Sequence, residues 1–314
     1  MPNNFCFIVD GINVEGELPV EIIPGHWFRK ATSEEVKRIK EELAMRRIPL
    51  IKYEYKAVPV IKEGIPKGSE TYEPLPSNEW RYYVISFEGS NDKIQDIEHA
   101  ASLLEHDINI GFTFLYSQMG PDGYGVMYNP FIVSTFFVDE FMPYRQVISI
   151  ESNELLEITT NYDLITKLDK ASYSNISRAV SDFYQTKMIT NRSLLKVVSY
   201  FSIIECLITH YPSAIDSIES VTRQVKTKMS LLSKRFQREL DYSVYFGKAT
   251  SENVWKKLYS YRSKVAHGME VNFEGELKIL VSRDNIQEFL KESVKLLLLY
   301  ALTEPDFVTD LQRC

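Results

Sequence analysis

The chain has 314 residues, of which 44% are hydrophobic and 25% are charged, and its formal net charge is −7 at pH 7. This length accommodates two domains, and this composition excludes a disordered, collagenous or disulfide-stapled chain. Three cysteines (Cys6, Cys206 and Cys314) are far apart and odd in number, which predicts a reducing compartment and neither a disulfide framework nor a zinc site. The start of the chain lacks the pattern of a secretory signal, and the longest apolar run, residues 294–302, is about half of the roughly 20 residues that span a bilayer. We therefore expect a cytoplasmic protein that does not bind membranes.

Glycine and proline divide the chain into two parts. Ten of 13 glycines and eleven of 13 prolines precede residue 150. Because these residues form turns and break helices, the first half is predicted to be rich in strands and loops and the second half to be helical. We predict a two-domain protein, with an α+β domain at residues 1–155 and an all-α antiparallel helical bundle at residues 160–314.

In the first half, segments rich in β-branched and aromatic residues are separated by turn signals. They predict strands within residues 5–14, 20–28, 50–61, 80–89, 111–118, 124–138 and 144–151. Two helices are predicted between them, at residues 32–46, where Thr32 is a good N-cap, and at residues 91–106, which are amphipathic. Residues 62–78 are rich in Pro, Gly and Ser and are predicted to form an exposed loop.

In the second half, apolar residues recur at helical spacing over long segments that contain few breakers. The predicted helices lie at residues 163–187, 191–210, 213–236, 251–267 and 284–302. Asp284 and Asn285 are predicted to cap the last of them. Short connections between these helices favour antiparallel neighbours.

Charge is distributed unevenly along the chain. Residues 171–314 hold 20 Lys and Arg against 16 Asp and Glu, whereas residues 1–170 hold 16 against 27. The basic excess is concentrated in residues 221–264, where eleven basic side chains face three acidic ones. Such a patch attracts polyanions, although a solvated face of two helices is the alternative interpretation. The candidate phosphate-binding residues are Arg223, Lys226, Lys256, Lys257 and Lys264.

The segment LYSYRSKVAHG, residues 258–268, contains an arginine and a histidine separated by four residues. In a regular helix the step from Arg262 to His267 places the two side chains about 140° apart, so a straight helix does not present them on one face. Gly268 follows, and glycine at a helix C-terminus supplies a left-handed cap. Either the backbone at this cap turns His267 toward Arg262, or a second subunit completes the pair. The helix C-terminus also favours a protonated imidazole.

This segment resembles the HEPN family. RSKVAH fits the Arg-x4–6-His motif of HEPN domains, and LYSYRSKVAHG is similar to the signature of the Apea-like HEPN branch. YFSIIECLI, at residues 200–208, resembles that branch's helix with aromatic residues before a glutamate, and VTRQVKTKMSLLSKR, at residues 221–235, resembles the basic helix that follows. The resemblance covers about residues 170–305, which is the second half only.

The resemblance implies a HEPN-like bundle that acts as an endoribonuclease without a metal or cofactor, with an active site composed across a homodimer. His267 would be the general acid/base, and Arg262 would hold the scissile phosphate. These residue types suit the reaction, because RNA supplies its own 2′-hydroxyl nucleophile, histidine transfers protons near neutral pH and a guanidinium matches phosphate oxygens. The basic residues of the patch would then bind RNA. The resemblance further implies a role in prokaryotic antiviral defence or toxin-like growth arrest, with an unknown trigger bound by the N-terminal domain.

Several residues near the motif are predicted to support it. An unpaired carboxylate at Glu205, among apolar neighbours, would be costly, so we predict that Glu205 orients Arg262 from the adjacent helix. Ser263 follows the arginine where many HEPN nucleases have Asn, Asp or His, and it keeps a hydrogen-bonding group there. Tyr259 and Tyr261 could stack on bases or pack in the interior.

A different class of function is also open. HEPN-like bundles can lose activity and keep RNA or protein binding, so the alternative is an inactive module that acts as a scaffold or sensor. No metal site is predicted, because the remaining histidines (His26, His99, His106 and His210) lack metal-binding spacing. His99 is expected at the surface of its helix.

Overall fold

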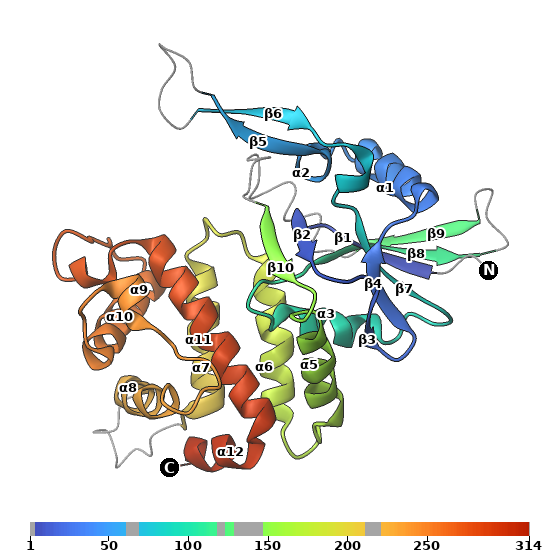
Figure 1. Ribbon diagram of the computed structural model, residues 1–314. Coiled ribbons are helices and arrows are strands. Elements are labelled where there is room, and N and C mark those ends of the chain that lie inside the picture. Colours follow the sequence, from blue (N-terminus) through green and yellow to red (C-terminus); the bar gives the residue numbers. More distant parts are fainter. Residues whose placement is uncertain (1–3, 61–68, 118–122, 129–146, 211–220, 314) are drawn as a thin grey trace. The chain divides into compact units, whose positions relative to one another are not determined.

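The computed structural model describes residues 4–60, 69–117, 123–128, 147–210 and 221–313. The chain divides into two compact units, Met1–Tyr162 and Asp163–Cys314, which are the N-terminal and C-terminal units. Helix α5 (Leu156–Lys167) contains the division. The N-terminal unit contains an antiparallel sheet and the C-terminal unit is helical (Figure 1), as the distribution of glycine and proline predicts.

A six-stranded antiparallel sheet organises the N-terminal unit, with the order β3-β4-β7-β1-β8-β9. Strand β1 is central and pairs with β7 on one side and β8 on the other, and helix α3 (Ile94–Ser102) lies between β7 and β8 in the chain. The strand bounds are β1 Asn4–Ile8, β3 Val20–Ile23, β4 His26–Lys30, β7 Tyr83–Phe87, β8 Ile110–Tyr116 and β9 Tyr124–Tyr128. The predicted strand 124–138 is described only as far as residue 128, and the rest of it lies outside the described residues.

The core of this unit is aromatic because the central strands place phenylalanines on one face. Phe5 stacks on Phe114 with ring centroids 4.4 Å apart, and Phe7 lies parallel to Phe112 at 6.1 Å. Both pairs are register partners of β1 and β8. Helix α1 (Ser33–Met45) buries its apolar residues in the same cluster. Burial of these rings is the main stabilising term for this layer.

Cys6 alternates with these phenylalanines and therefore faces the other side of the sheet, near Glu98 of α3. Burial raises the pKa of the Cys6 thiol to about 12, so the thiol stays protonated at neutral pH. Cys6 and Cys206 are free, and Cys314 lies outside the described residues. The prediction that His99 lies at the surface of α3 is wrong. His99 is buried, because residues on more than one side of this helix are buried in the N-terminal unit.

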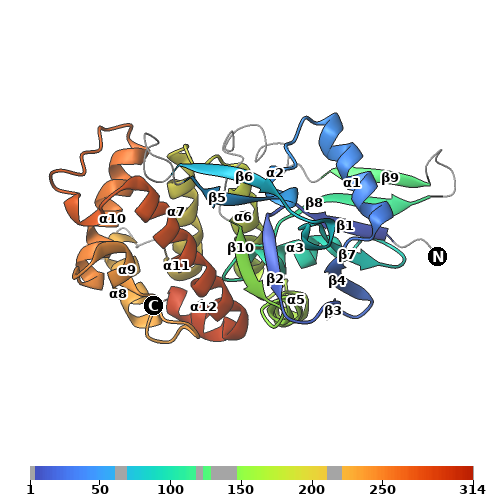
Figure 2. The same cartoon turned by 45° about the horizontal axis from the view of Figure 1, so that its top comes forward.

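Two smaller sheets complete the N-terminal unit. Strand β2 (Ile12–Glu15) pairs in parallel with β10 (Ile148–Glu151), and β5 (Tyr55–Pro59) pairs antiparallel with β6 (Glu70–Pro74), as Figure 1 and Figure 2 show. Two secondary-structure predictions for residues 50–78 need correction. Part of the predicted loop 62–78 is strand β6, followed by the turn η1 (Ser77–Glu79), and the start of the predicted strand 50–61 is the helical turn α2 (Ile51–Glu54). A mostly exposed hairpin has no alternating apolar face to reveal it.

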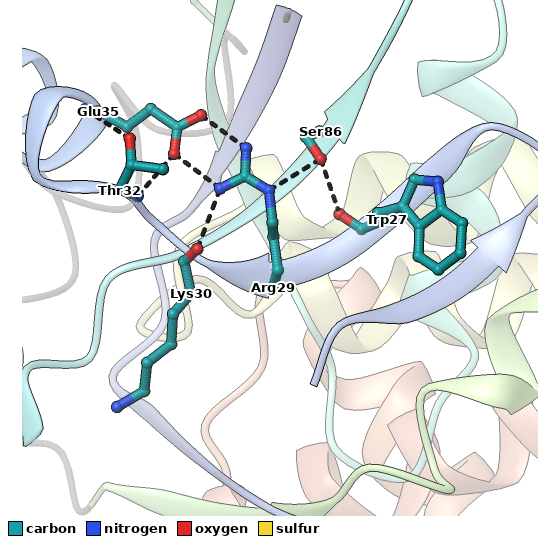
Figure 3. Close-up of polar contacts among 6 residues, drawn as sticks. All are labelled: Trp27, Arg29, Lys30, Thr32, Glu35 and Ser86. Carbon is teal, nitrogen blue, oxygen red and sulfur yellow. Dashed lines mark hydrogen bonds and ion pairs between the residues drawn. The ribbon is translucent and has the colours of Figure 1, made fainter. Parts of the chain in front are cut away.

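The start of α1 is fixed by a network of hydrogen bonds (Figure 3). Thr32 is the N-cap, as predicted, and its side chain and that of Glu35 form a reciprocal capping box. Arg29 of β4 donates two hydrogen bonds of 2.7 Å to the Glu35 carboxylate. Its Nε donates to Ser86 Oγ of β7 at 3.0 Å, and its Nη1 donates to the Lys30 carbonyl at 3.0 Å. One guanidinium therefore ties α1 to two neighbouring strands.

The C-terminal unit is built around α7, which contacts α6, α8, α10, α11 and α12. The helix bounds are α6 Ser174–Gln185, α7 Leu195–Ile208, α8 Val221–Leu232, α9 Tyr242–Phe246, α10 Ser251–Ala266, α11 Arg283–Thr303 and α12 Pro305–Arg313, with short 3-10 turns at Thr186–Met188 and Lys278–Leu280. Half of the residues of α7 are buried, which is typical of a helix surrounded by others.

Two helix predictions for this unit need correction, and two helices are additional. The predicted helix 163–187 is two helices, because the Asp169 carboxylate accepts hydrogen bonds from the backbone of Ala171 and Ser172 and forms a turn in place of helix. Ser282, not Asp284 or Asn285, caps α11, and its Oγ accepts from the Asn285 N–H at 3.2 Å. Helices α9 and α12 were not predicted. The first part of the predicted helix 213–236 lies outside the described residues up to residue 220.

Two absences hold for the described part of the chain. None of its helices combines the length and the apolar character that crossing a bilayer requires. Its His, Cys, Asp and Glu side chains form no group of three or more that could hold a metal ion.

Candidate functional site

The C-terminus of α10 has the geometry that Gly268 predicts. Gly268 adopts a left-handed conformation with φ of 64°, directly after the C-cap His267. The Gly268 N–H donates to the Val265 carbonyl at 3.2 Å, and the Met269 N–H donates to the Lys264 carbonyl at 2.8 Å. These two bonds form a Schellman motif, in which glycine avoids the strain of a positive φ.

Glu205 of α7 holds two side chains of α10. The Arg262 Nη2 donates to Glu205 Oε2 at 3.3 Å, and the Tyr259 hydroxyl donates to Glu205 Oε1 at 3.0 Å. Tyr259 and Arg262 are three positions apart, so they lie on one side of the helix and face α7 together. The predicted contact between Glu205 and Arg262 is therefore present. Tyr259 is an additional partner of the carboxylate that the spacing of the motif does not reveal.

The two tyrosines beside the motif pack in the interior. Tyr259 is buried edge-on against Phe201, with ring centroids 5.0 Å apart, and Tyr261 is buried against Phe273 at 5.8 Å. Burial, together with the negative charge of Glu205, raises the pKa of Tyr259, so its hydroxyl remains a donor to that carboxylate. Packing, not stacking on bases, is thus the role that these rings have in this unit.

The Arg262 guanidinium is anchored at one point and has donors to spare. Its side chain is 32% exposed. Of its three nitrogens, only Nη2 has a hydrogen-bond partner among the described residues, and Nε is a buried donor without one. A phosphate group is the kind of acceptor that a guanidinium binds through two parallel hydrogen bonds.

His267 is exposed at the end of the same helix, but it does not turn toward Arg262. Its φ of −98° and ψ of 9° stay near the helical region, and its N–H donates to the Ser263 carbonyl at 3.1 Å. The reversal of the chain comes one residue later, at Gly268. The step from Arg262 to His267 therefore remains close to the 140° of a regular helix. Of the two alternatives, a backbone that turns His267 toward Arg262 at the cap is not observed, and completion of the pair by a second subunit stays a prediction. One copy of α10 presents the two groups on different sides, with Ser263 exposed between them.

The side of α10 opposite Arg262 carries two of the candidate RNA-binding lysines together with a carboxylate. Glu276, from the segment after the helix, lies 3.3 Å from Lys257 Nζ and 3.8 Å from Lys264 Nζ, and it accepts a hydrogen bond of 3.0 Å from Ser260 Oγ. The bonds from Ser260 and Lys257 hold the pKa of Glu276 below its usual range. The carboxylate is thus a counter-ion for this face at neutral pH.

The other candidate RNA-binding residues are more dispersed. Lys226 forms an ion pair with Glu252 at 3.4 Å, while Lys256 and Arg223 are exposed. Charge counting over residues 221–264 therefore overestimates the free positive charge, because it leaves out Glu276, which lies twelve residues beyond the window. No sequence spacing signals that pairing, since the loop that carries Glu276 folds back onto α10.

The described site therefore consists of three parts: a guanidinium fixed by a carboxylate, an exposed imidazole at a helix C-terminus, and a lysine face with its own counter-ion. The guanidinium can bind an anion and the imidazole can transfer a proton. Within one copy of α10 the two groups lie on different sides of the helix.

Comparison of the chain with protein-family models, with curated proteins and with solved structures found no match. Membership of the HEPN family therefore stays a prediction. It is based on the residues of the motif and of the helices around it in this sequence.

Proposed function

We propose that the C-terminal unit is a HEPN-like helical bundle that acts as a metal-independent endoribonuclease. The observation that carries the proposal is the pairing of Arg262 with Glu205 one turn before a helix end that exposes His267. A carboxylate that fixes an arginine while leaving its other donors open prepares the guanidinium for a phosphate. The proposed setting is cytoplasmic, in antiviral defence or toxin-like growth arrest, as the sequence resemblance implies.

In the proposed reaction, the 2′-hydroxyl of RNA attacks the adjacent phosphorus and the 5′-oxygen leaves. The neutral imidazole of His267 accepts the proton of the 2′-hydroxyl, and the imidazolium that this forms donates a proton to the leaving 5′-oxygen. Arg262 hydrogen-bonds the non-bridging oxygens, where negative charge accumulates in the transition state. Tyr259 and Glu205 act as positioning residues, because they touch Arg262 or its partner and not the substrate.

The proposed active site is shared by two copies of the chain in a homodimer. Within one α10, the guanidinium and the imidazole are about 140° apart around the helix axis, too divergent to contact one phosphate. Two copies related by a two-fold axis bring Arg262 of one copy toward His267 of the other and form two equivalent sites. The resulting pairs of cations would also bind the RNA backbone.

The first test is cleavage of total RNA by the full-length protein in the presence of EDTA. We expect cleavage by the wild type, and a decrease of about 10²–10³-fold for Arg262→Ala and for His267→Ala. Lys248→Ala is a matched control, because it removes an exposed positive charge of the same basic segment away from the motif. No cleavage by the wild type, or full cleavage by both motif variants, would favour an inactive scaffold or sensor module instead.

The second test asks whether the site is shared. An equimolar mixture of Arg262→Ala and His267→Ala chains is refolded or co-expressed to allow exchange of subunits. In a mixed dimer, one site then contains an intact Arg262 from one copy and an intact His267 from the other. We expect a substantial fraction of wild-type activity to return on mixing. Two inactive variants that stay inactive after verified exchange would contradict the shared site.

A further inference from the structure

Three donors of α10 converge on the carboxylate of Glu276. Ser260 Oγ donates to Glu276 Oε1 at 3.0 Å, and Lys257 Nζ donates to the same oxygen at 3.3 Å. Lys264 Nζ lies 3.8 Å from Oε2. Two ammonium groups and a hydroxyl around one anion are also the donors with which proteins hold a backbone phosphate. The set that holds this carboxylate therefore suits a phosphate in its place.

The three donors lie on the side of α10 that leads to His267. In a regular helix, positions i, i+3, i+7 and i+10 fall within an arc of about 80° around the axis. The positions that share this arc are Lys257, Ser260, Lys264 and His267. Arg262 lies on the opposite side. Along the axis, Ser260 and Lys264 are about 10 and 5 Å from His267, so an RNA strand bound at His267 can contact these donors as well.

The segment that carries Glu276 is anchored on both sides of this residue. Before it, Phe273 packs against Tyr261, with ring centroids 5.8 Å apart. After it, Leu277 is fully buried. The side chain of Glu276 itself is 52% exposed. Rotation of this one side chain is therefore enough to release the donors, and a ligand that displaces it does not need to reorder the backbone.

The carboxylate of Glu276 competes with other anions for these donors. The hydrogen bonds from Ser260 and Lys257 lower the pKa of Glu276, so the carboxylate is ionised at neutral pH. A strand of RNA presents a series of phosphates and releases counter-ions when it binds, whereas Glu276 offers one carboxylate. RNA can therefore replace Glu276, with an affinity that the competition lowers.

We propose that Lys257, Ser260 and Lys264 form a binding site for a backbone phosphate of the RNA near the scissile bond, and that Glu276 occupies this site until RNA displaces it. The site belongs to the copy of the chain that supplies His267. The identity of the ligand rests on the proposed function, whereas the roles of Ser260 as a phosphate ligand and of Glu276 as an internal competitor are additional to it.

The test is a double-mutant cycle between Ser260 and Glu276, measured by fluorescence anisotropy of the full-length protein with a labelled single-stranded 2′-O-methyl RNA. This RNA lacks the 2′-hydroxyl nucleophile, so it stays intact and binding is measured apart from cleavage. Ser260→Ala keeps the net charge and removes a donor from both the carboxylate and the phosphate. With Glu276 present the two losses offset each other, and we expect the affinity to change by less than about twofold. In a Glu276→Gln background the competitor is neutral, and we expect Ser260→Ala to weaken binding about fivefold.

Ser199→Ala is the matched control, because the Ser199 hydroxyl donates to the Leu195 carbonyl of its own helix, α7. It should leave the affinity for RNA unchanged with either residue at position 276. Equal effects of Ser260→Ala in the two backgrounds would contradict competition between Glu276 and RNA. The absence of an effect in both would exclude Ser260 as a phosphate ligand, and the absence of RNA binding by every variant would overturn the site altogether.

The outcome of this cycle is separate from the outcome of the cleavage assays. A protein that shows the coupling between Ser260 and Glu276 but does not cleave RNA has the phosphate site and is not a ribonuclease. A protein that cleaves RNA but shows no coupling is a ribonuclease without this site.

Discussion

In each unit an arginine pairs with a glutamate: Arg29 with Glu35 in the N-terminal unit, and Arg262 with Glu205 in the C-terminal unit. The two guanidinium groups differ in how many of their nitrogens have hydrogen-bond partners. In the N-terminal unit, all three nitrogens of Arg29 donate hydrogen bonds, two of them to Glu35 at 2.7 Å. In the C-terminal unit, Arg262 meets Glu205 through a single contact of 3.3 Å, and its Nε has no partner among the described residues. Every nitrogen of the first guanidinium donates a hydrogen bond, whereas only one nitrogen of the second does so among the described residues.

This difference separates a structural arginine from one that can bind a ligand. A largely buried guanidinium with a partner at every nitrogen fixes the position of an element, because movement of that element would leave buried donors unsatisfied. A guanidinium held at one edge is oriented but still has donors for a phosphate. Both glutamates share their carboxylates with a second donor, the Thr32 backbone for Glu35 and the Tyr259 hydroxyl for Glu205. The two pairs therefore differ in the hydrogen bonds of their arginines and not in those of their glutamates. Substitution of one pair at a time tests this difference.

The largest expected effect is on activity, from Arg262→Lys. Lysine keeps the charge but loses the planar fork, so we expect RNA cleavage to decrease by about 10²-fold. The free energy of unfolding should change by no more than about 1 kcal/mol, because the pair is partly exposed and has one long contact. Cleavage rates and urea unfolding of the same preparation measure both. A large loss of stability with activity retained would show that Arg262 is a structural residue like Arg29.

Arg29→Lys should have the opposite profile. Lysine cannot replace the bonds to Glu35, Ser86 and the Lys30 carbonyl at once, so we expect the N-terminal unit to lose about 1.5–3 kcal/mol of stability. Hydrogen exchange measured by mass spectrometry should show faster exchange in β4 and in the first turn of α1, with α10 unchanged. Exchange that stays slow in those segments would mean that the network is not required for the packing of α1.

A smaller effect is expected in the pH dependence of stability at Glu35. Burial by itself raises the pKa of this carboxyl, but the hydrogen bonds from Arg29 and Thr32 outweigh it and lower the pKa. A carboxyl with a lowered pKa in the folded state contributes stability above its unfolded pKa of ~4.3, and this contribution is lost as the pH falls through the folded value. The gap in unfolding free energy between wild type and Glu35→Gln should thus be widest at neutral pH and narrow in acid. Urea unfolding between pH 7 and pH 3 measures it, and parallel curves would contradict the coupling.

The smallest expected effect concerns Glu276 and the lysine face of α10. Glu276→Gln removes the counter-ion of Lys257 and Lys264, so we expect RNA to bind about two- to fivefold more tightly, with a steeper dependence on salt. Fluorescence anisotropy with a labelled single-stranded RNA at two salt concentrations measures this. Glu274→Gln, an exposed change in the same loop, is the matched control. Equal effects of the two variants would indicate a general charge effect and not a specific pairing with the lysines.

Local signals in the sequence predicted much of the fold. Thr32 as an N-cap, Gly268 as a left-handed C-cap and most helices and strands follow from side-chain chemistry within a few residues. The errors arose where a partner far along the chain decides the outcome. Strand β6 has a polar sequence and is a strand because β5 pairs with it. The break at Asp169 depends on a side chain that competes for backbone donors, which hydrophobic periodicity does not record.

For the candidate site, the sequence placed Arg262, His267 and Glu205 and anticipated the contact between two of them. It could not show that the backbone of His267 stays near the helical region, since this depends on whether the chain reverses before or after the C-cap. It also missed Glu276, because a loop that folds back onto a helix leaves no spacing pattern.

The sequence by itself determined the division into a strand-rich and a helical part, the caps at Thr32 and Gly268 and the residue types of the proposed chemistry, because these depend on local propensity and composition. Only the tertiary structure decided which arginine has a partner at every nitrogen and which is held through a single nitrogen. It also decided that Lys257 and Lys264, which count toward the basic excess of residues 221–264, have the carboxylate of Glu276 as a partner. Hydrogen-bond saturation and burial depend on atoms that are distant in the chain and meet only after folding.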